Sequence, residues 1–125
     1  MAAKKIMIVD DNREFLEELA ETLKMSGYEV VMVAEAAAVL DTAAKIKPDV
    51  ILLDLKMPGK SGFEVADELK HFSELEQVPI IAMTGFLKDE STALMEMCGI
   101  RKCLRKPFNP SELIAEIEAV TGRNN

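Results

Sequence analysis

Residues 6–11 read Ile-Met-Ile-Val-Asp-Asp, a short apolar run that ends in two acidic side chains. The run is continuously apolar instead of alternating, which is typical of a strand buried on both faces of a parallel sheet. Similar runs follow at Val30–Ala34, Val50–Leu53 and Pro79–Met83, with a weaker one at Cys103–Leu104. The sequence therefore predicts five short strands.

Segments with helical spacing separate these runs. In the first segment, Phe15, Leu16, Leu19 and Leu23 mark one face, glutamates mark the other, and Gly27 supplies a stop. Further helices are predicted over about residues 36–46, from Ser61 through Leu69, over about residues 89–97, and from Asn109 to Val120.

This alternation of strands and helices predicts an α/β fold. With right-handed crossovers it gives a doubly wound five-stranded parallel sheet covered by five helices. The 125 residues suffice for one such domain. In sheets of this kind, ligands bind beyond the carboxyl ends of the strands, where the strand order reverses. The residues at those ends are therefore the candidates for function.

Polar residues follow four of the five runs: Asp10-Asp11, Asp54, Thr84-Gly85 and Lys106-Pro107. If the first and third strands are neighbours, three carboxylates converge and repel one another unless a cation joins them. Carboxylate oxygens suit Mg²⁺, and the absence of a His or Cys cluster in the sequence argues against zinc. A carboxylate nucleophile, a divalent ion, a lysine and a hydroxyl together form a site for taking up a phosphoryl group.

The composition and the net charge exclude several types of protein and make several binding partners improbable. Apolar residues make up 49% and charged residues 30%, which excludes a disordered or fibrous chain. The net charge of −7 argues against direct binding to nucleic acid or to an anionic membrane as the main role. Cys98 and Cys103 are too few for a disulfide framework and are interpreted as reduced thiols. Because the sequence shows neither a signal peptide nor a transmembrane span, we expect a cytoplasmic protein.

Taken together, these residues resemble the receiver domain of bacterial two-component response regulators. The resemblance rests on Asp10-Asp11, on Asp54 followed by Met57-Pro58-Gly59 and Gly62, on Thr84-Gly85, and on Lys106-Pro107-Phe108. It extends from Lys5 to about Thr121, with the motifs in the family's order and spacing. It implies a single receiver domain over residues 1–125 with the flavodoxin-like strand order 2-1-3-4-5.

The resemblance also implies a role for each site residue. Asp54 would accept a phosphoryl group from a phosphohistidine, and Asp11 and Asp54 would bind Mg²⁺ with the backbone carbonyl of Lys56. Asp10 would act on the ion directly or through water. Thr84 would supply the hydroxyl that moves towards the phosphoryl oxygens. Lys106 would supply the amine that pairs with them, and the Lys106-Pro107 peptide bond is expected to be cis.

The partners implied are a sensor histidine kinase or a phosphotransfer protein as donor, and an output protein. The output protein, or a second copy of the chain after phosphorylation, is expected to dock through the helix at 89–97, the strand at 103–104 and the helix from Asn109. Arg101, Lys102 and Arg105 gather basic charge there, and a solvated strand edge protected by charge explains them equally well. The only catalysis implied is the chain's own phosphorylation and dephosphorylation.

One position departs from the family pattern, and another is expected to affect how easily water reaches the site. Cys103 stands three residues before Lys106, where most relatives carry Tyr or Phe, and a thiol is too small to report the movement of Thr84 by rotating inward. Phe86, two residues after Thr84, is expected to screen the phosphoryl group from water.

Alternatives to a stand-alone switch remain open. One is a receiver-like module that binds its partner without phosphorylation, and another is a receiver fragment of a larger regulator or hybrid kinase. A Mg²⁺-dependent phosphohydrolase is disfavoured, because Lys56 stands where such enzymes with a related sheet usually carry a second aspartate.

Overall fold

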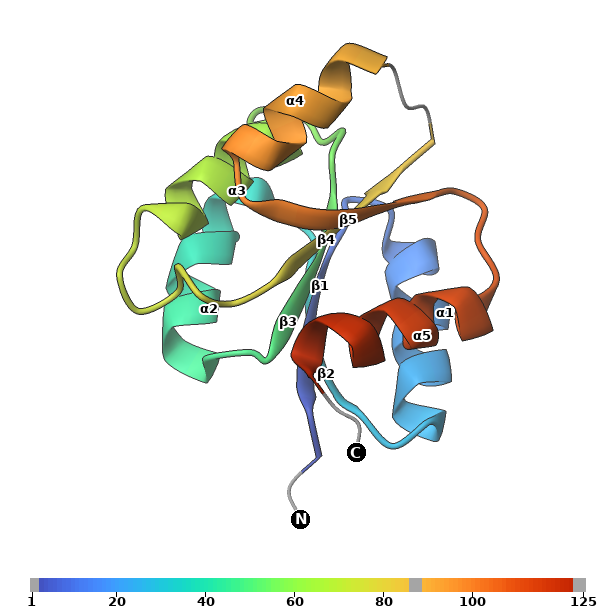
Figure 1. Cartoon of the computed structure of the whole chain (residues 1–125). Helices are drawn as coiled ribbons and strands as arrows, with labels where there is room; N and C mark the ends of the chain where they lie inside the picture. Colours follow the sequence, from blue (N-terminus) through green and yellow to red (C-terminus); the bar gives the residue numbers. More distant parts are fainter. Residues whose placement is uncertain (1–2, 86–88, 123–125) are drawn as a thin grey trace.

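Five parallel strands form one sheet in the order β2-β1-β3-β4-β5, as the resemblance implied (Figure 1). The strands are β1 (Lys5–Val9), β2 (Glu29–Val33), β3 (Val50–Asp54), β4 (Ile80–Thr84) and β5 (Ile100–Arg105). The structure is a computed structural model, and it describes residues 3–85 and 89–122.

Helices cover both faces of the sheet. They are α1 (Arg13–Met25), α2 (Val39–Ile46), α3 (Gly62–Lys70), α4 (Asp89–Met97) and α5 (Pro110–Thr121). Figure 1 shows α1 and α5 on one face and α2, α3 and α4 on the other. The fold class predicted from the alternation of apolar runs and helical segments is therefore confirmed.

The sheet separates two apolar cores because successive strand residues point to opposite faces. Ile51 and Leu53 of β3 pack with α2, α3 and α4, whereas Leu52 packs with α1 and α5. Every residue of β3 and β4 is buried, which explains why their sequences are continuously apolar until the final polar residue.

Two helices begin where the sequence predicted, each directly after its N-cap residue. Ser61 and Glu64 form a complete capping box at the start of α3. Asn109 caps α5, and Pro110 occupies its first turn. The second helix differs from its prediction, because residues 36–38 form a short 3₁₀ turn before α2 begins at Val39.

The fifth strand is longer than the apolar pair at 103–104 predicted. β5 lies at the edge of the sheet and pairs only with β4, so its outward positions tolerate charged side chains. Arg101, Lys102 and Arg105 are exposed on it, and they interrupt the apolar pattern that marked the inner strands. Within residues 3–85 and 89–122, no helix combines the length and the apolar character needed to cross a membrane.

Candidate functional site

Strand register brings the acidic residues together. Val9 of β1 is paired with Leu53 of β3, so Asp10 and Asp54 follow at the same level of two neighbouring strands. One carboxylate oxygen from each of Asp10, Asp11 and Asp54 lies within 4.8 Å of the others. The convergence expected from the strand ends is present.

The three carboxylates differ in burial and in hydrogen bonding. Asp10 and Asp54 are buried, at 1% and 6% exposure, whereas Asp11 is exposed. Asp10 Oδ1 accepts the backbone N–H of Asn12 at 3.0 Å, and Asp54 Oδ1 accepts that of Lys56 at 3.4 Å. These turn hydrogen bonds hold the two buried carboxylates at the carboxyl edge of the sheet.

Lys106 reaches the acidic cluster from the end of β5. Its Nζ donates to Asp10 Oδ2 at 2.6 Å and lies 3.9 Å from Asp54 Oδ1. Its backbone N–H donates to the carbonyl oxygen of Thr84 at 2.7 Å, which ties the lysine to the end of β4. Thr84 is buried, and the Lys106-Pro107 peptide bond is cis as expected. The structure therefore brings together the predicted side chains of Asp10, Asp11, Asp54 and Lys106, and the backbone of Thr84 joins them through Lys106.

The electrostatics of the site disfavour an ionised Asp54. Burial away from water, followed by the negative charge of Asp10, raises the pKa of Asp54 from 3.8 to about 6. The ammonium of Lys106 and the backbone N–H of Lys56 act in the opposite direction, and Asp11 adds a smaller repulsion. Among the described residues, the one ammonium that contacts the cluster, that of Lys106, does not balance the charge of three carboxylates.

The donor set fits a hard divalent cation. Carboxylate oxygens are the protein ligands that Mg²⁺ prefers, and the exposed Asp11 leaves one side of the cluster in contact with water. A cation bound there would also relieve the repulsion that raises the pKa of Asp54. For the predicted sixth residue, Lys56, the structure gives the N–H contact with Asp54, and the ligand role of its carbonyl stays a prediction.

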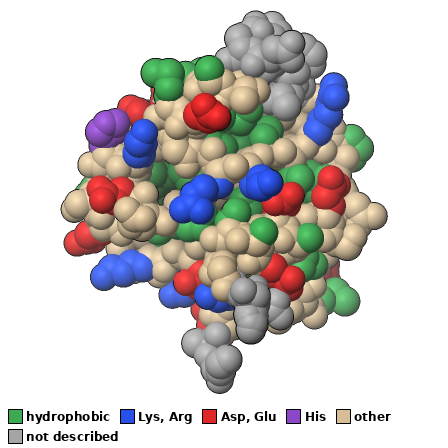
Figure 2. All heavy atoms as spheres, viewed as in Figure 1, with side chains coloured by type: hydrophobic (Ala, Val, Ile, Leu, Met, Phe, Trp, Pro, Cys, Tyr) green, Lys and Arg blue, Asp and Glu red, His purple; other side chains and the backbone are tan. Residues whose placement is uncertain are grey.

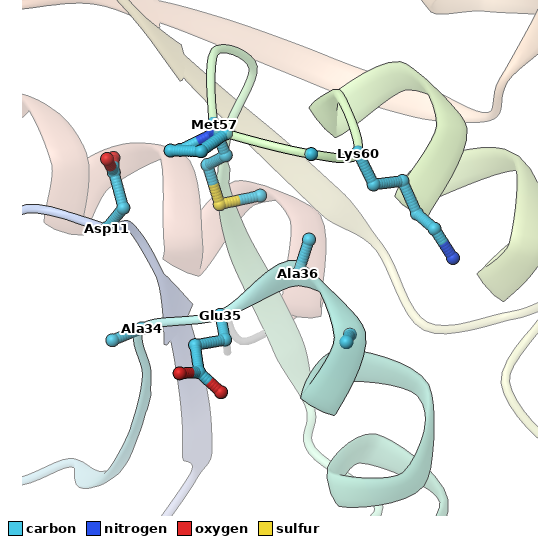
Figure 3. A pocket seen from close by; sticks show the side chains of 9 residues that line it. Asp11, Ala34, Glu35, Ala36, Met57 and Lys60 are labelled. Carbon is cyan, nitrogen blue, oxygen red and sulfur yellow. The ribbon is translucent and has the colours of Figure 1, made fainter.

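A hollow of about 460 Å³ opens beside Asp11. It lies between the loops that follow β1, β2 and β3, with Ala34, Ala36 and Met57 in its lining (Figure 3). Figure 3 shows the Lys60 amine directed away from the hollow, and this amine is paired with Glu68 at 2.6 Å. The largely apolar hollow thus adjoins the acidic cluster through Asp11.

Sequence analysis missed one neighbour of the lysine. Phe15 packs beside the core, as its predicted place on the apolar face of the first helix requires, and its ring also lies under Lys106, with Nζ 4.2 Å from the ring centroid. Phe108 contacts the same ring edge to face, with centroids 6.1 Å apart and an interplanar angle of 84°. The only available signal was the position of Phe15 in the first turn of the helix after the acidic pair, and that signal does not fix the rotation of the helix.

Two further positions singled out in the sequence are Cys103 and Phe86. Cys103 is half-buried and packs against the core on the α2, α3 and α4 side. Burial raises the pKa of its thiol. Phe86, expected to screen the site, lies outside the described residues.

The sequence of this chain matches one protein family and is similar to known members of it. A family model for the response regulator receiver domain matches residues 6–118. The phosphate regulon transcriptional regulatory protein PhoB of Pseudomonas aeruginosa is 36% identical over 98% of this chain and 54% of its own length. The polar-differentiation response regulator DivK of Brucella anthropi is 32% identical over 95% of this chain and 97% of its own length. The chain thus spans about half of one relative and almost all of the other.

Solved structures share the fold. The chemotaxis protein CheY4 of Vibrio cholerae, crystallized at low pH, superposes with a TM-score of 0.91 and 32% identity, covering 95% of this chain and 99% of that one. The receiver domain of the sensor histidine kinase PA1611 of Pseudomonas aeruginosa, described with a magnesium ion coordinated in its active site cleft, superposes with a TM-score of 0.88. It is 27% identical and covers 98% of this chain and 100% of that one.

Proposed function

The chain belongs to the response regulator receiver family, and on that premise we propose that it is a switch that accepts a phosphoryl group on Asp54. Receiver domains are signalling switches of two-component systems and interact with histidine kinases and output proteins. We further propose that residues 1–125 form a single receiver domain, because one sheet and its two cores account for all the described strands and helices.

One observation carries the proposal: Asp54 lies buried at the carboxyl edge of the sheet, close to two other carboxylates and to an ammonium. Its Oδ1 is 3.9 Å from Lys106 Nζ, and Lys106 is itself held by Asp10. A carboxylate in an ordinary ion pair needs one cation beside it, and it has no need of two further carboxylates within 4.8 Å. The arrangement suits a group that must take on more negative charge and have it neutralised.

In the proposed reaction, a carboxylate oxygen of Asp54 forms a bond to phosphorus as the bond between phosphorus and the donor histidine nitrogen breaks. The departing imidazole keeps the electron pair of the broken bond. In this proposal the Lys106 ammonium, which lies 3.9 Å from Asp54 Oδ1, would pair with the transferred oxygens, and the Thr84 hydroxyl would donate a hydrogen bond to them. Asp54 ends as an acyl phosphate, which carries more negative charge and more acceptor oxygens than the carboxylate it replaces.

Magnesium is the proposed cofactor of this site. Receiver domains bind Mg²⁺ at an acidic pocket, and Asp10, Asp11 and Asp54 form such a cluster here. When bound, the ion would neutralise the negative charge that gathers on the phosphoryl oxygens. In this chain, Asp11 and Asp54 would hold the ion with the carbonyl of Lys56, and Asp10 would act directly or through water.

The proposed donor is a sensor histidine kinase or a phosphotransfer protein. The proposed docking face for an output protein, or for a second copy of the chain, is formed by α4, β5 and α5. In Figure 2, Lys and Arg side chains gather near the middle of the face viewed, over β5, where Arg101, Lys102 and Arg105 are exposed. Lys102 is 3.8 Å from Glu116 of α5, which links the strand to the helix on this face.

Incubation with acetyl phosphate and Mg²⁺, followed by intact mass measurement, tests the proposal. The wild-type protein should gain the mass of one phosphoryl group, and the Asp54→Asn variant should not. Asp41→Asn, which changes an exposed aspartate on α2, is the matched control and should react like wild type. If neither acetyl phosphate nor a phosphorylated kinase yields an adduct, the chain is better described as a binding module that works without phosphorylation.

A further inference from the structure

We infer that Phe15 is a positioning residue that holds the Lys106 amine against the acidic cluster. The inference rests on the proposed function and deepens it, because it adds an aromatic side chain to a site otherwise built from acids, an amine and a hydroxyl. Lys106 Nζ lies 4.2 Å from the centroid of the Phe15 ring while it also contacts Asp10. An ammonium over the face of an aromatic ring is attracted by the negative charge of the π system.

The ring supplies a restraint that the ion pair alone lacks. A lysine side chain is flexible, and its ammonium is strongly hydrated. Lys106 is only 23% exposed, because the ring covers one side of the amine while Asp10 and Asp54 occupy another. Water is thereby replaced by a surface that attracts the cation without competing for its hydrogen bonds to carboxylate or phosphoryl oxygens.

The position of the ring is itself fixed from two directions. On α1, the backbone N–H of Phe15 donates to Asn12 Oδ1 at 3.1 Å, and the N–H of Asn12 donates to Asp10 Oδ1 at 3.0 Å. From the segment after β5, Phe108 packs edge to face on the ring. A continuous set of contacts therefore runs from the acidic pair through the helix cap to the ring and back to the segment that carries Lys106.

A simpler role for Phe15 is to fill space between α1 and α5, where it packs beside the core. The two roles predict different responses to changes that keep the bulk of the ring. Core filling requires volume, whereas positioning of the ammonium requires the negative face of the ring. Fluorination separates them, because it withdraws charge from that face while it leaves the shape of the ring nearly unchanged.

The first test places mono-, di- and trifluorinated phenylalanine at position 15 and measures the rate of phosphorylation by acetyl phosphate at saturating Mg²⁺. The rate is expected to fall stepwise, by about fivefold over the series, which corresponds to about 1 kcal/mol. The same analogues at Phe72, which packs against the core on the other face of the sheet, are the matched control and should leave the rate unchanged. Equal rates throughout the series at position 15 would overturn the inference while the proposed function stands.

The second test does not depend on phosphorylation. In the wild-type protein, the ring current of Phe15 should shift the ε-methylene proton resonances of Lys106 upfield, and in Phe15→Leu these resonances should return towards the values of an ordinary lysine. If the resonances are the same in both proteins, the ammonium is not held over the ring and the inference fails. If wild type shows the shift but accepts no phosphoryl group from any donor, the contact is supported and only the proposed function is lost.

Discussion

Replacing Asp54 by Asn is expected to stabilise the folded protein in the absence of divalent cations, although the change removes the proposed phosphoryl acceptor. Asp54 is buried, and its neighbours Asp10 and Asp11 repel its charge, so the pKa of its carboxyl is raised to about 6. At neutral pH the fold therefore contains a carboxylate in its unfavourable, ionised form. An amide has nearly the same shape, and its oxygen can still accept the N–H of Lys56.

The magnitude follows from the displacement of the pKa. A change from 3.8 to about 6 is about two pKa units, and each unit corresponds to about 1.4 kcal/mol, which gives an upper limit of about 3 kcal/mol. The new amide loses part of this gain because its N–H groups need acceptors in the site. We expect Asp54→Asn to raise the free energy of unfolding by about 1–3 kcal/mol at about pH 8.

The sign of the pH dependence is fixed by the direction of the displacement. Between 3.8 and about 6, the folded protein retains a proton on Asp54 that the unfolded chain has lost, so wild-type stability falls as pH rises through this window. Below the window both states are protonated, and the destabilisation disappears. The advantage of the Asn variant should therefore be near zero at about pH 3, which lies below the window, and fully developed above about pH 7.

Urea unfolding followed by circular dichroism, with a chelator present, measures this difference across the pH range. Asp41→Asn serves as the control for an exposed aspartate and should differ little from wild type at any pH. Millimolar Mg²⁺ should stabilise the wild-type protein more than Asp54→Asn, because the cation relieves the same repulsion. If Asp54→Asn is no more stable than wild type at about pH 8, the electrostatic account of the site is wrong.

Three further changes probe the surroundings of Asp54. In Gly62→Ala the new Cβ would lie 2.5 Å from the backbone oxygen of Asp54, so we expect a loss of about 1–3 kcal/mol in urea unfolding and slower phosphorylation by acetyl phosphate. Lys106→Met leaves the buried carboxylate of Asp10 without its ammonium partner, so stability at about pH 8 should fall by about 1–3 kcal/mol and partly recover on addition of Mg²⁺. Burial raises the pKa of the Cys103 thiol, so iodoacetamide should modify it more slowly at neutral pH than it modifies a free thiol; reaction as fast as that of glutathione would contradict the burial.

The fold was predictable because the signals that determine it are local. Continuous apolar runs mark β1, β3 and β4, since these inner strands are buried on both faces. The edge strand β5 was underestimated for the same reason, because its outward positions are free to carry Arg101 and Lys102. The capping box at Ser61 needed no tertiary information either, because its hydrogen bonds join residues three apart.

The site was predictable only in part. Parallel strands end at a common edge, so the residues after them, such as Asp10, Asp54 and Lys106, had to lie near one another once the strand order was right. The contact between Lys106 and Phe15 depends instead on how α1 is rotated about its axis and on where Phe108 packs. Those are consequences of side-chain packing between distant segments, and hydrophobic periodicity does not encode them.

The charges of the site explain why stability and function oppose each other at Asp54. Among the described residues, three carboxylates lie close together and the Lys106 ammonium contacts two of them, so the ionised site carries an excess of negative charge. Removing one of these carboxylates is expected to strengthen the fold, yet the same excess is what a divalent cation neutralises. An acyl phosphate on Asp54 adds still more negative charge, so the site can hold it only if cations are already in place. If the chain is phosphorylated as proposed, the repulsion that weakens the folded protein is thus the property that would make phosphorylation depend on a bound cation and on the position of the Lys106 amine.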